Sequence, residues 1–108
     1  MDREKLRARY LQDEWPRQVG NLASTLGRLS SRAVDPRYDQ TVADLLHEGT
    51  LLIEWCGPNV PLEIASDLAM MQRELALWRQ IWPNEPARPL LALRARQMSD
   101  RLLEAAGF

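Results

Sequence analysis

The sequence DPRYDQTVADLLHEGTLLIEWC, residues 35–56, predicts the central helix of the fold. Its apolar and small residues recur at alternating steps of four and three, the spacing of one stripe along an α-helix. The stripe consists of Tyr38, Val42, Leu45, Gly49, Leu52 and Cys56. Apolar side chains near the C-terminal end, from Leu46 to Trp55, widen the apolar arc to roughly 220°, where a surface helix needs little more than 100°. We therefore expect this helix either to lie between several neighbours or to present a second face to a partner.

Proline and glycine mark both ends of this helix. Asp35 followed by Pro36 is a typical helix start, because Asp can cap free N–H groups and Pro needs no N–H bond in the first turn. Gly57 followed by proline indicates the end, with Gly57 in the left-handed conformation. Asn59 is then expected to cap the next helix.

The same spacing recurs on either side of the central helix. The stripe before it is Val19, Leu22, Leu26, Leu29 and Ala33, and the stripe after it is Ile64, Leu68, Met71, Leu75, Trp78 and Trp82. A last helix from about Ala87 to Ala106 points Leu91, Ala95, Met98 and Leu102 inward and stops at Gly107. Short connections make successive helices antiparallel. The prediction is one all-α domain, residues 1–108, an up-down-up-down antiparallel four-helix bundle.

Residues 1–12 are highly charged and carry few apolar anchors. They are either a loose N-terminal arm or the beginning of a helix that runs on and kinks at Pro16. In the first case Asp13 caps a helix that has Pro16 in its first turn. The periodicity permits both arrangements.

Bulk composition is that of an ordinary soluble domain, with 45% hydrophobic and 27% charged residues and a net charge of −1. No apolar run approaches the roughly 18 residues that span a bilayer, and the N-terminus MDREKLRARY is too charged for a secretory signal. Cys56 is the only cysteine and cannot form an internal disulfide. We expect a cytoplasmic protein without a membrane partner.

Groups for catalysis or metal binding are scarce. His47 is the only histidine and lies away from the apolar stripe, with Asp44 one turn earlier and Glu48 beside it. One histidine cannot supply the two Glu-x-x-His motifs of a di-iron bundle, and no Glu-x-x-Glu pair or phosphate-binding glycine loop occurs. We therefore expect no catalytic residue, no metal and no cofactor, and a buried, inert Cys56. A ligand-binding enzyme around Asp44, His47 and Glu48 is the third hypothesis.

Surplus apolar residues favour a different role. The helix after the central one carries a rear stripe nearly opposite its core stripe, and the end of the central helix carries Trp55, a residue type common in interface hot spots. The candidate interface residues are Leu51, Trp55, Met70, Leu77 and Ile81. The leading hypothesis is a non-catalytic protein–protein interaction module that binds a second copy, as a homodimer, or another protein, as an adaptor.

Arginine dominates the basic residues and suggests an alternative. A nucleic-acid-associated regulator would use the basic ends of the chain, because Arg suits phosphate contacts. These residues are Arg3, Lys5, Arg7, Arg9, Arg88, Arg94, Arg96 and Arg101. Carboxylates are interspersed among them and no recognition helix can be identified, so solvated helix faces explain them better.

The segments LQDEWPRQVGNLASTLGRLSSR, IEWCGPNVP and LLALRARQMSDRLLEAAGF resemble small helical proteins of cyanobacteria. The resemblance spans most of the chain and contains no catalytic signature. It implies a cytoplasmic bacterial protein and supplies no site residues.

Overall fold

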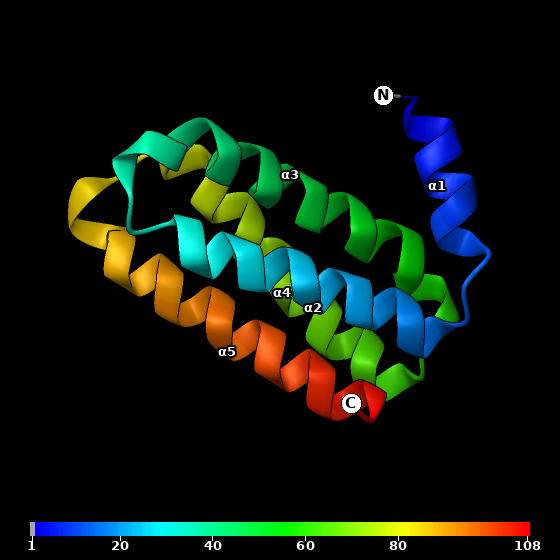
Figure 1. Ribbon diagram of the computed structural model, residues 1–108. Coiled ribbons are helices and arrows are strands. Elements are labelled where there is room, and N and C mark those ends of the chain that lie inside the picture. The colour runs from blue at the N-terminus through cyan, green and yellow to red at the C-terminus, as the bar shows by residue number, and fades with distance from the viewer. Residues whose placement is uncertain (1) are drawn as a thin grey trace.

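The computed structural model describes residues 2–108, which form helices joined by short turns and contain no strand (Figure 1). The α-helices are α1 (Arg3–Leu11), α2 (Trp15–Arg32), α3 (Asp39–Cys56), α4 (Leu62–Ile81) and α5 (Arg88–Ala106). Single 3₁₀ turns at Pro36–Tyr38, Gly57–Asn59 and Glu85–Ala87 lead out of or into the long helices. The predicted all-α class is confirmed. Within residues 2–108, no helix combines the length and the apolar character needed to cross a membrane.

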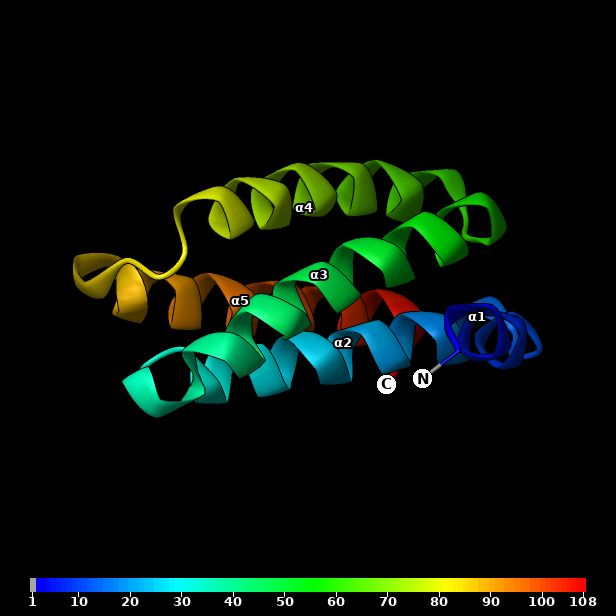
Figure 2. The same ribbon diagram turned by 90° about the horizontal axis from the view of Figure 1, so that it is seen from above.

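The four long helices are packed unequally. α2 packs against α5 and α3, and α3 also packs against α4, whereas α4 and α5 touch at only a few points (Figure 2). Consecutive long helices run in opposite directions in Figure 1. A bundle closed on all four sides would need a packed seam between α4 and α5, and the described residues do not form one.

The predicted core stripes are buried. Every predicted inward position of α2 and of α5 is buried, and so are those of α3 and α4 within the helices themselves. Tyr38 and Trp82, at the ends of two stripes, are partly buried against the core. The helical period therefore identified the interior correctly.

The wide apolar arc of α3 is explained by its neighbours. Leu46 and Ile53, which lie off the main stripe, are buried because α2, α4 and α1 all contact this helix. Trp55 is only 8% exposed, and its ring centroid lies 6.0 Å from that of Tyr10 on α1. Of the two expectations for this helix, its position between several neighbours accounts for the arc.

The N-terminal segment is a separate docked helix. α1 ends at Leu11 and α2 starts at Trp15, so no continuous helix kinks at Pro16. The Tyr10 hydroxyl donates to the Gln18 carbonyl over 2.7 Å, and the buried Gln18 amide donates to the Asp13 carbonyl over 2.9 Å. Tyr10 was missed as an anchor because one aromatic residue in a charged segment produces no apolar stripe.

Three predicted helix ends differ from the structure. Glu14, not Asp13, precedes the first residue of α2, and Pro61, not Asn59, precedes α4. Asn59 lies in a 3₁₀ turn, and Gly57 has right-handed helical backbone angles because the chain continues from α3 directly into that turn. Gly107 does have the predicted left-handed conformation, with φ at 85°.

Small residues hold α2 and α5 close together. The Ser99 hydroxyl of α5 donates to the Ala23 carbonyl over 2.8 Å, and the Ser30 hydroxyl of α2 donates to the Ala92 carbonyl over 2.6 Å. A serine side chain is short, so such bonds to the facing backbone need close helix approach. Gly20, Ala23, Gly27 and Ser30 recur at helical spacing along this side of α2.

Arg88 joins the start of α5 to the start of α3. Its guanidinium is buried and donates to both carboxylate oxygens of Asp39, at 2.7 and 3.0 Å, and to the Ala33 carbonyl. The same group lies over the Trp82 ring and bonds Glu85. These bonds lower the pKa of Asp39, mainly through the hydrogen bonds from Arg88.

Candidate functional site

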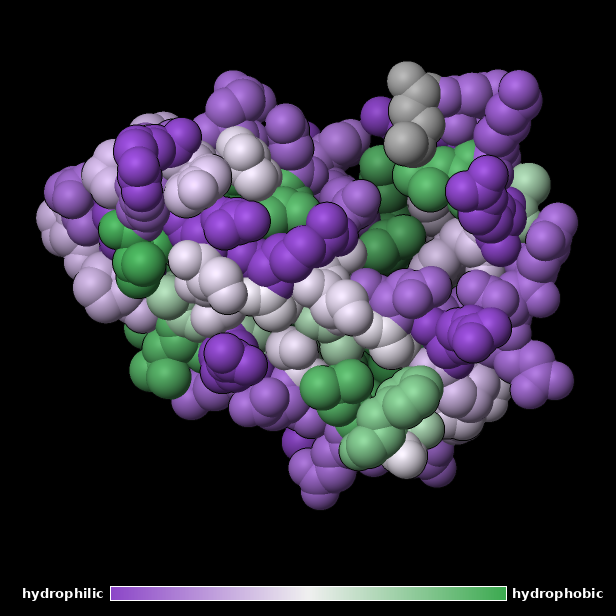
Figure 3. Space-filling view, viewed as in Figure 1, coloured by the Kyte–Doolittle hydropathy of each residue, from purple (hydrophilic) through white to green (hydrophobic). Residues whose placement is uncertain are grey.

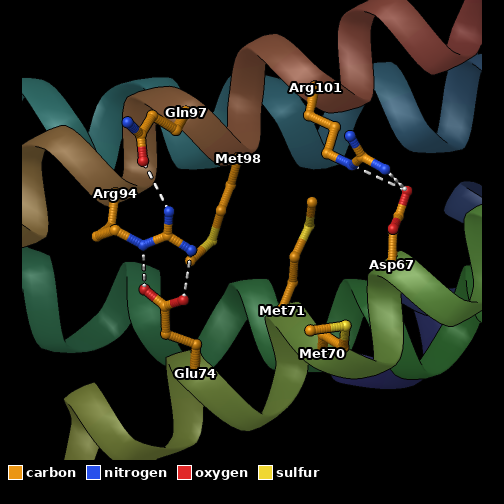
Figure 4. Close-up of a pocket in the computed structure, with 8 residues that line it drawn as sticks. All are labelled: Asp67, Met70, Met71, Glu74, Arg94, Gln97, Met98 and Arg101. Carbon is orange, nitrogen blue, oxygen red and sulfur yellow. Dashed lines mark hydrogen bonds and ion pairs between the residues drawn. The ribbon is translucent and has the colours of Figure 1, made fainter.

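The sparse α4–α5 seam contains a hollow lined by residues of both helices. A cavity of about 370 Å³ lies between the two helices, and Met71 and Met98 point into it from opposite sides (Figure 4). Both methionines are buried, while Met70 beside them is exposed. Methionine is flexible and fills irregular space without close interdigitation. The seam therefore has an apolar floor without the close helix contact seen between α2 and α5.

Two ion pairs bridge the seam. Arg94 of α5 donates to both oxygens of Glu74 on α4, at 3.0 and 2.7 Å, and Arg101 donates to Asp67 over 3.0 Å (Figure 4). The hydrogen bonds from Arg94 are the main cause of the lowered pKa of Glu74. The bidentate Arg94–Glu74 pair fixes the separation of the helices more strongly than a single contact would.

An apolar rim continues the seam toward the α4–α5 turn. We define the apolar rim as Met70, Leu77, Ile81 and Leu90. Three of these side chains, with Trp78, line a second hollow of about 310 Å³ whose wall is almost entirely apolar. Each rim residue is more than half exposed, and Met70 reaches 68%. Isolated exposed apolar residues are ordinary, but four along one seam make a candidate contact surface.

The face of the molecule drawn in Figure 3 is less apolar than the rim. In Figure 3 hydrophilic side chains predominate on the face formed largely by α1, α2, α3 and α5, and apolar residues gather there in separate small patches. Val34 and Phe108 are exposed apolar residues at ends of helices rather than along a seam. The apolar rim is therefore the best candidate for a functional surface.

The five predicted interface residues fall into two groups. Met70, Leu77 and Ile81 lie together on the apolar rim. Trp55 is buried under α1, and Leu51 is partly buried against the core, so neither belongs to that surface. The predicted contact region at the end of α3 is thus covered by the chain's own first helix. Periodicity could not show this, because the cover comes from a segment without a stripe.

The seam's polar residues were not predicted as a site. Glu74 and Asp67 had no signal of their own as site residues, and Arg94 and Arg101 were predicted only as basic residues. The signal that could have found them is possible ion pairing between the last two helices, because side chains of opposite charge on antiparallel neighbours can meet. Choosing the right partners needs the helix rotation that only the fold provides.

The three residues of the enzyme hypothesis, Asp44, His47 and Glu48, each contact different side chains. His47 Nε2 lies 3.3 Å from an Arg3 nitrogen, and burial with the nearby charges of Arg79 and Arg3 lowers the pKa of His47. Asp44 accepts a hydrogen bond from Gln40, while Glu48 bonds Thr25 and Arg28. Across residues 2–108, no three His, Cys, Asp or Glu side chains are placed to hold a metal ion.

Cys56 is fully buried next to Tyr10, and burial raises the pKa of its thiol. A thiol with a raised pKa is a poor nucleophile because the reactive species is the thiolate. The expectation of a buried thiol is confirmed.

The nucleic-acid hypothesis loses part of its basic surface. Arg88, Arg94 and Arg101 each bind a carboxylate, and Arg88 is buried. The basic residues of α1 are exposed but alternate with Asp2 and Glu4. An arginine already paired with a carboxylate offers little net attraction to phosphate.

No family model, curated protein or solved structure matches this chain. The resemblance to small helical proteins of cyanobacteria stays a hypothesis.

Proposed function

We propose that this protein is a non-catalytic interaction module that binds protein through the apolar rim and the adjoining α4–α5 seam. In this proposal the four long helices act as an up-down-up-down antiparallel bundle whose α4–α5 side is completed by a partner. The observation that carries it is the placement of Met70, Leu77, Ile81 and Leu90 along the sparsely packed α4–α5 seam.

The free energy of apolar burial favours a partner that covers the apolar rim. Burying apolar surface contributes roughly 25 cal/mol per Å², so four large side chains that are now half exposed can stabilise a complex by several kcal/mol before association costs. Partly exposed ion pairs across the seam hold the two helices in place, so the surface is largely pre-formed. Such a surface binds with little ordering cost.

The proposal places the protein in the cytoplasm of a bacterium, as either a homodimer or an adaptor. A reducing cytoplasm suits a chain whose single thiol is buried and unpaired. The paired arginines of α5 favour a structural role over nucleic-acid binding.

A photo-crosslinking experiment tests the proposal. A benzophenone amino acid replaces Leu77 in the full chain, expressed in the native host and irradiated, and an identical substitution at Arg96 is the control. Arg96 is exposed and stands about 200° around α5 from Arg94, away from the seam. The expected result is a protein adduct from position 77 and little from position 96. Equal or absent adducts at both positions would refute the proposal.

A further inference from the structure

α1 is a short helix that is hinged at one end. It spans Arg3–Leu11 and joins α2 through the turn at residues 12–14, beside the four long helices in Figure 1. Tyr10 anchors it near this turn, through the bond to the Gln18 carbonyl and the contact with the Trp55 ring. Apart from this anchor, α1 touches α3 at few points. A contact at the free end, far from the hinge, therefore bears on whether α1 stays docked.

The contact at the free end joins Arg3 to His47. A guanidinium nitrogen of Arg3 lies 3.3 Å from Nε2 of His47, which stands in the middle of α3. An arginine side chain donates hydrogen bonds and accepts none, so Nε2 accepts here and the neutral ring has its proton on Nδ1. Nδ1 is buried and has no hydrogen-bond partner among residues 2–108. The contact thus needs the neutral form of the ring.

Positive charges predominate around this ring. Arg3 of α1 and Arg79 of α4 both act on it, and Asp44, one turn earlier in α3, is the carboxylate that opposes them. α2 directs Arg28 to the neighbouring Glu48 instead. A proton added to the ring therefore places a third positive charge beside two arginines.

The sign of the pH effect follows from the neutral ring. Burial and the charges of Arg79 and Arg3 lower the pKa of His47 from its usual value of 6.5. A group whose pKa is lowered by docking favours the docked state when it is neutral. Docking of α1 is thus strongest above pH 6.5 and weakens as the pH falls below 6.5 toward the lowered pKa.

We propose that the Arg3–His47 contact is a pH-sensitive latch, which holds α1 on α3 when the ring is neutral and releases α1 when the ring is protonated. The added proton binds Nε2, where it removes the acceptor of the Arg3 bond and faces the guanidinium. Release uncovers Trp55 at the end of α3, because α1 brings Tyr10 against that ring. The latch is independent of the apolar rim, since it consists of side chains of α1 and α3.

Hydrogen exchange of the full chain measures docking. A helix of nine residues is too short to persist alone in water, so release of α1 appears as lost protection of its amides. Residues 7–11 are the reporters, because their N–H groups bond to carbonyls one turn earlier in α1. After correction for intrinsic exchange rates, their protection should be about threefold lower at pH 5.0 than at pH 7.5, as expected of a contact between exposed side chains. Amides of α5 are the reference and should show no such loss.

His47→Gln tests the titration. Glutamine offers an acceptor oxygen to Arg3 but does not titrate, so protection of residues 7–11 should be equal at the two pH values. Lys5→Gln is the matched control, because it removes an exposed cation of α1 and leaves the latch intact. That variant should keep the wild-type difference. A difference that survives in His47→Gln would overturn the latch, and so would equal protection at both pH values in the wild-type chain.

Titration of the His47 ring by NMR is the second readout. His47 is the only histidine of the chain, so an untagged protein gives one titrating ring. Because the coupling between docking and protonation is reciprocal, loss of the cation in Arg3→Gln should raise the pKa of His47. Lys5→Gln should leave that pKa near the wild-type value. An equal pKa in the wild-type chain and in Arg3→Gln would show that Arg3 does not act on the ring, and would refute the latch.

Discussion

α5 makes two seams, and they differ in how the helices approach each other. Against α2 it packs through small residues, close enough for Ser99 and Ser30 to reach the facing backbone. Against α4 it is held by long arginine side chains that bind Glu74 and Asp67, above a floor of methionines. Close packing yields a dry interior, while long bridging side chains leave a hollow with an apolar rim. Side-chain length therefore separates the structural seam from the candidate binding seam.

Leu102→Ala should have the largest effect on this comparison. Leu102 is fully buried in α5, and a buried leucine replaced by alanine typically costs about 2–5 kcal/mol in transfer and cavity energy. Urea unfolding of the variant measures the loss in unfolding free energy. Leu93→Ala, at an exposed position of the same helix, should stay within about 0.5 kcal/mol, and an equal loss for both would contradict the burial pattern.

Ala23→Leu should be nearly as damaging. Ala23 is buried in α2 and its carbonyl accepts the Ser99 bond, so a larger side chain there overpacks the close seam at a cost of about 1–3 kcal/mol. The same exchange at exposed Ala76 on α4 is the matched control and should cost little. Thermal or urea unfolding of both variants compares the two seams, and tolerance of leucine at position 23 would show that the α2–α5 seam is not close-packed.

Glu74→Gln should have a smaller, pH-dependent effect on the α4–α5 seam. The pKa of Glu74 is lowered in the folded protein, mainly by hydrogen bonds from Arg94. The carboxylate therefore stabilises the fold at every pH above 4.5, the usual pKa of a glutamate. This contribution is lost as the pH falls through the lowered pKa. For a partly exposed pair we expect about 0.5–1 kcal/mol at pH 7 and almost none near pH 3.

Urea titrations of wild type and Glu74→Gln at both pH values measure that difference. A double-mutant cycle with Arg94→Met assigns it to the pair, since coupling should vanish in acid. A difference that is the same at pH 7 and pH 3 would show that the pair does not hold the seam.

Leu77→Ser should have the smallest effect on stability. Leu77 is 62% exposed, so its loss should change the unfolding free energy by no more than about 0.5 kcal/mol. Binding of a hydrophobic fluorescent dye should nevertheless fall, because the apolar rim loses a central member. A large loss of stability would mean that Leu77 contributes to the chain's own packing and would remove it from the candidate surface.

Helix content and core positions followed from the sequence because their cause is local. The four–three period places Val19 or Leu91 on an inward face whatever that face contacts, and proline with glycine limits each helix. The errors at Asp13, Asn59 and Gly57 lie at helix ends. There, 3₁₀ turns and alternative caps differ little in energy from the predicted forms.

The candidate surface was predicted only in part, because exposure depends on neighbours. Met70, Leu77 and Ile81 sit on the rear stripe of α4, and the structure leaves them uncovered. Trp55 and Leu51 have equally apolar surroundings in sequence, but α1 brings Tyr10 against Trp55. One buried aromatic residue, Tyr10, therefore helps to cover the end of α3, while the rear stripe of α4 stays exposed.

The chain's order of residues determined the four long helices, their inward faces and a surplus of apolar side chains, because these depend on spacing along one helix. Only the tertiary structure decided that α2 and α5 close tightly while α4 and α5 stay apart. The reason is that small residues line the first seam, whereas the second is bridged by arginine–carboxylate pairs and lined by methionines.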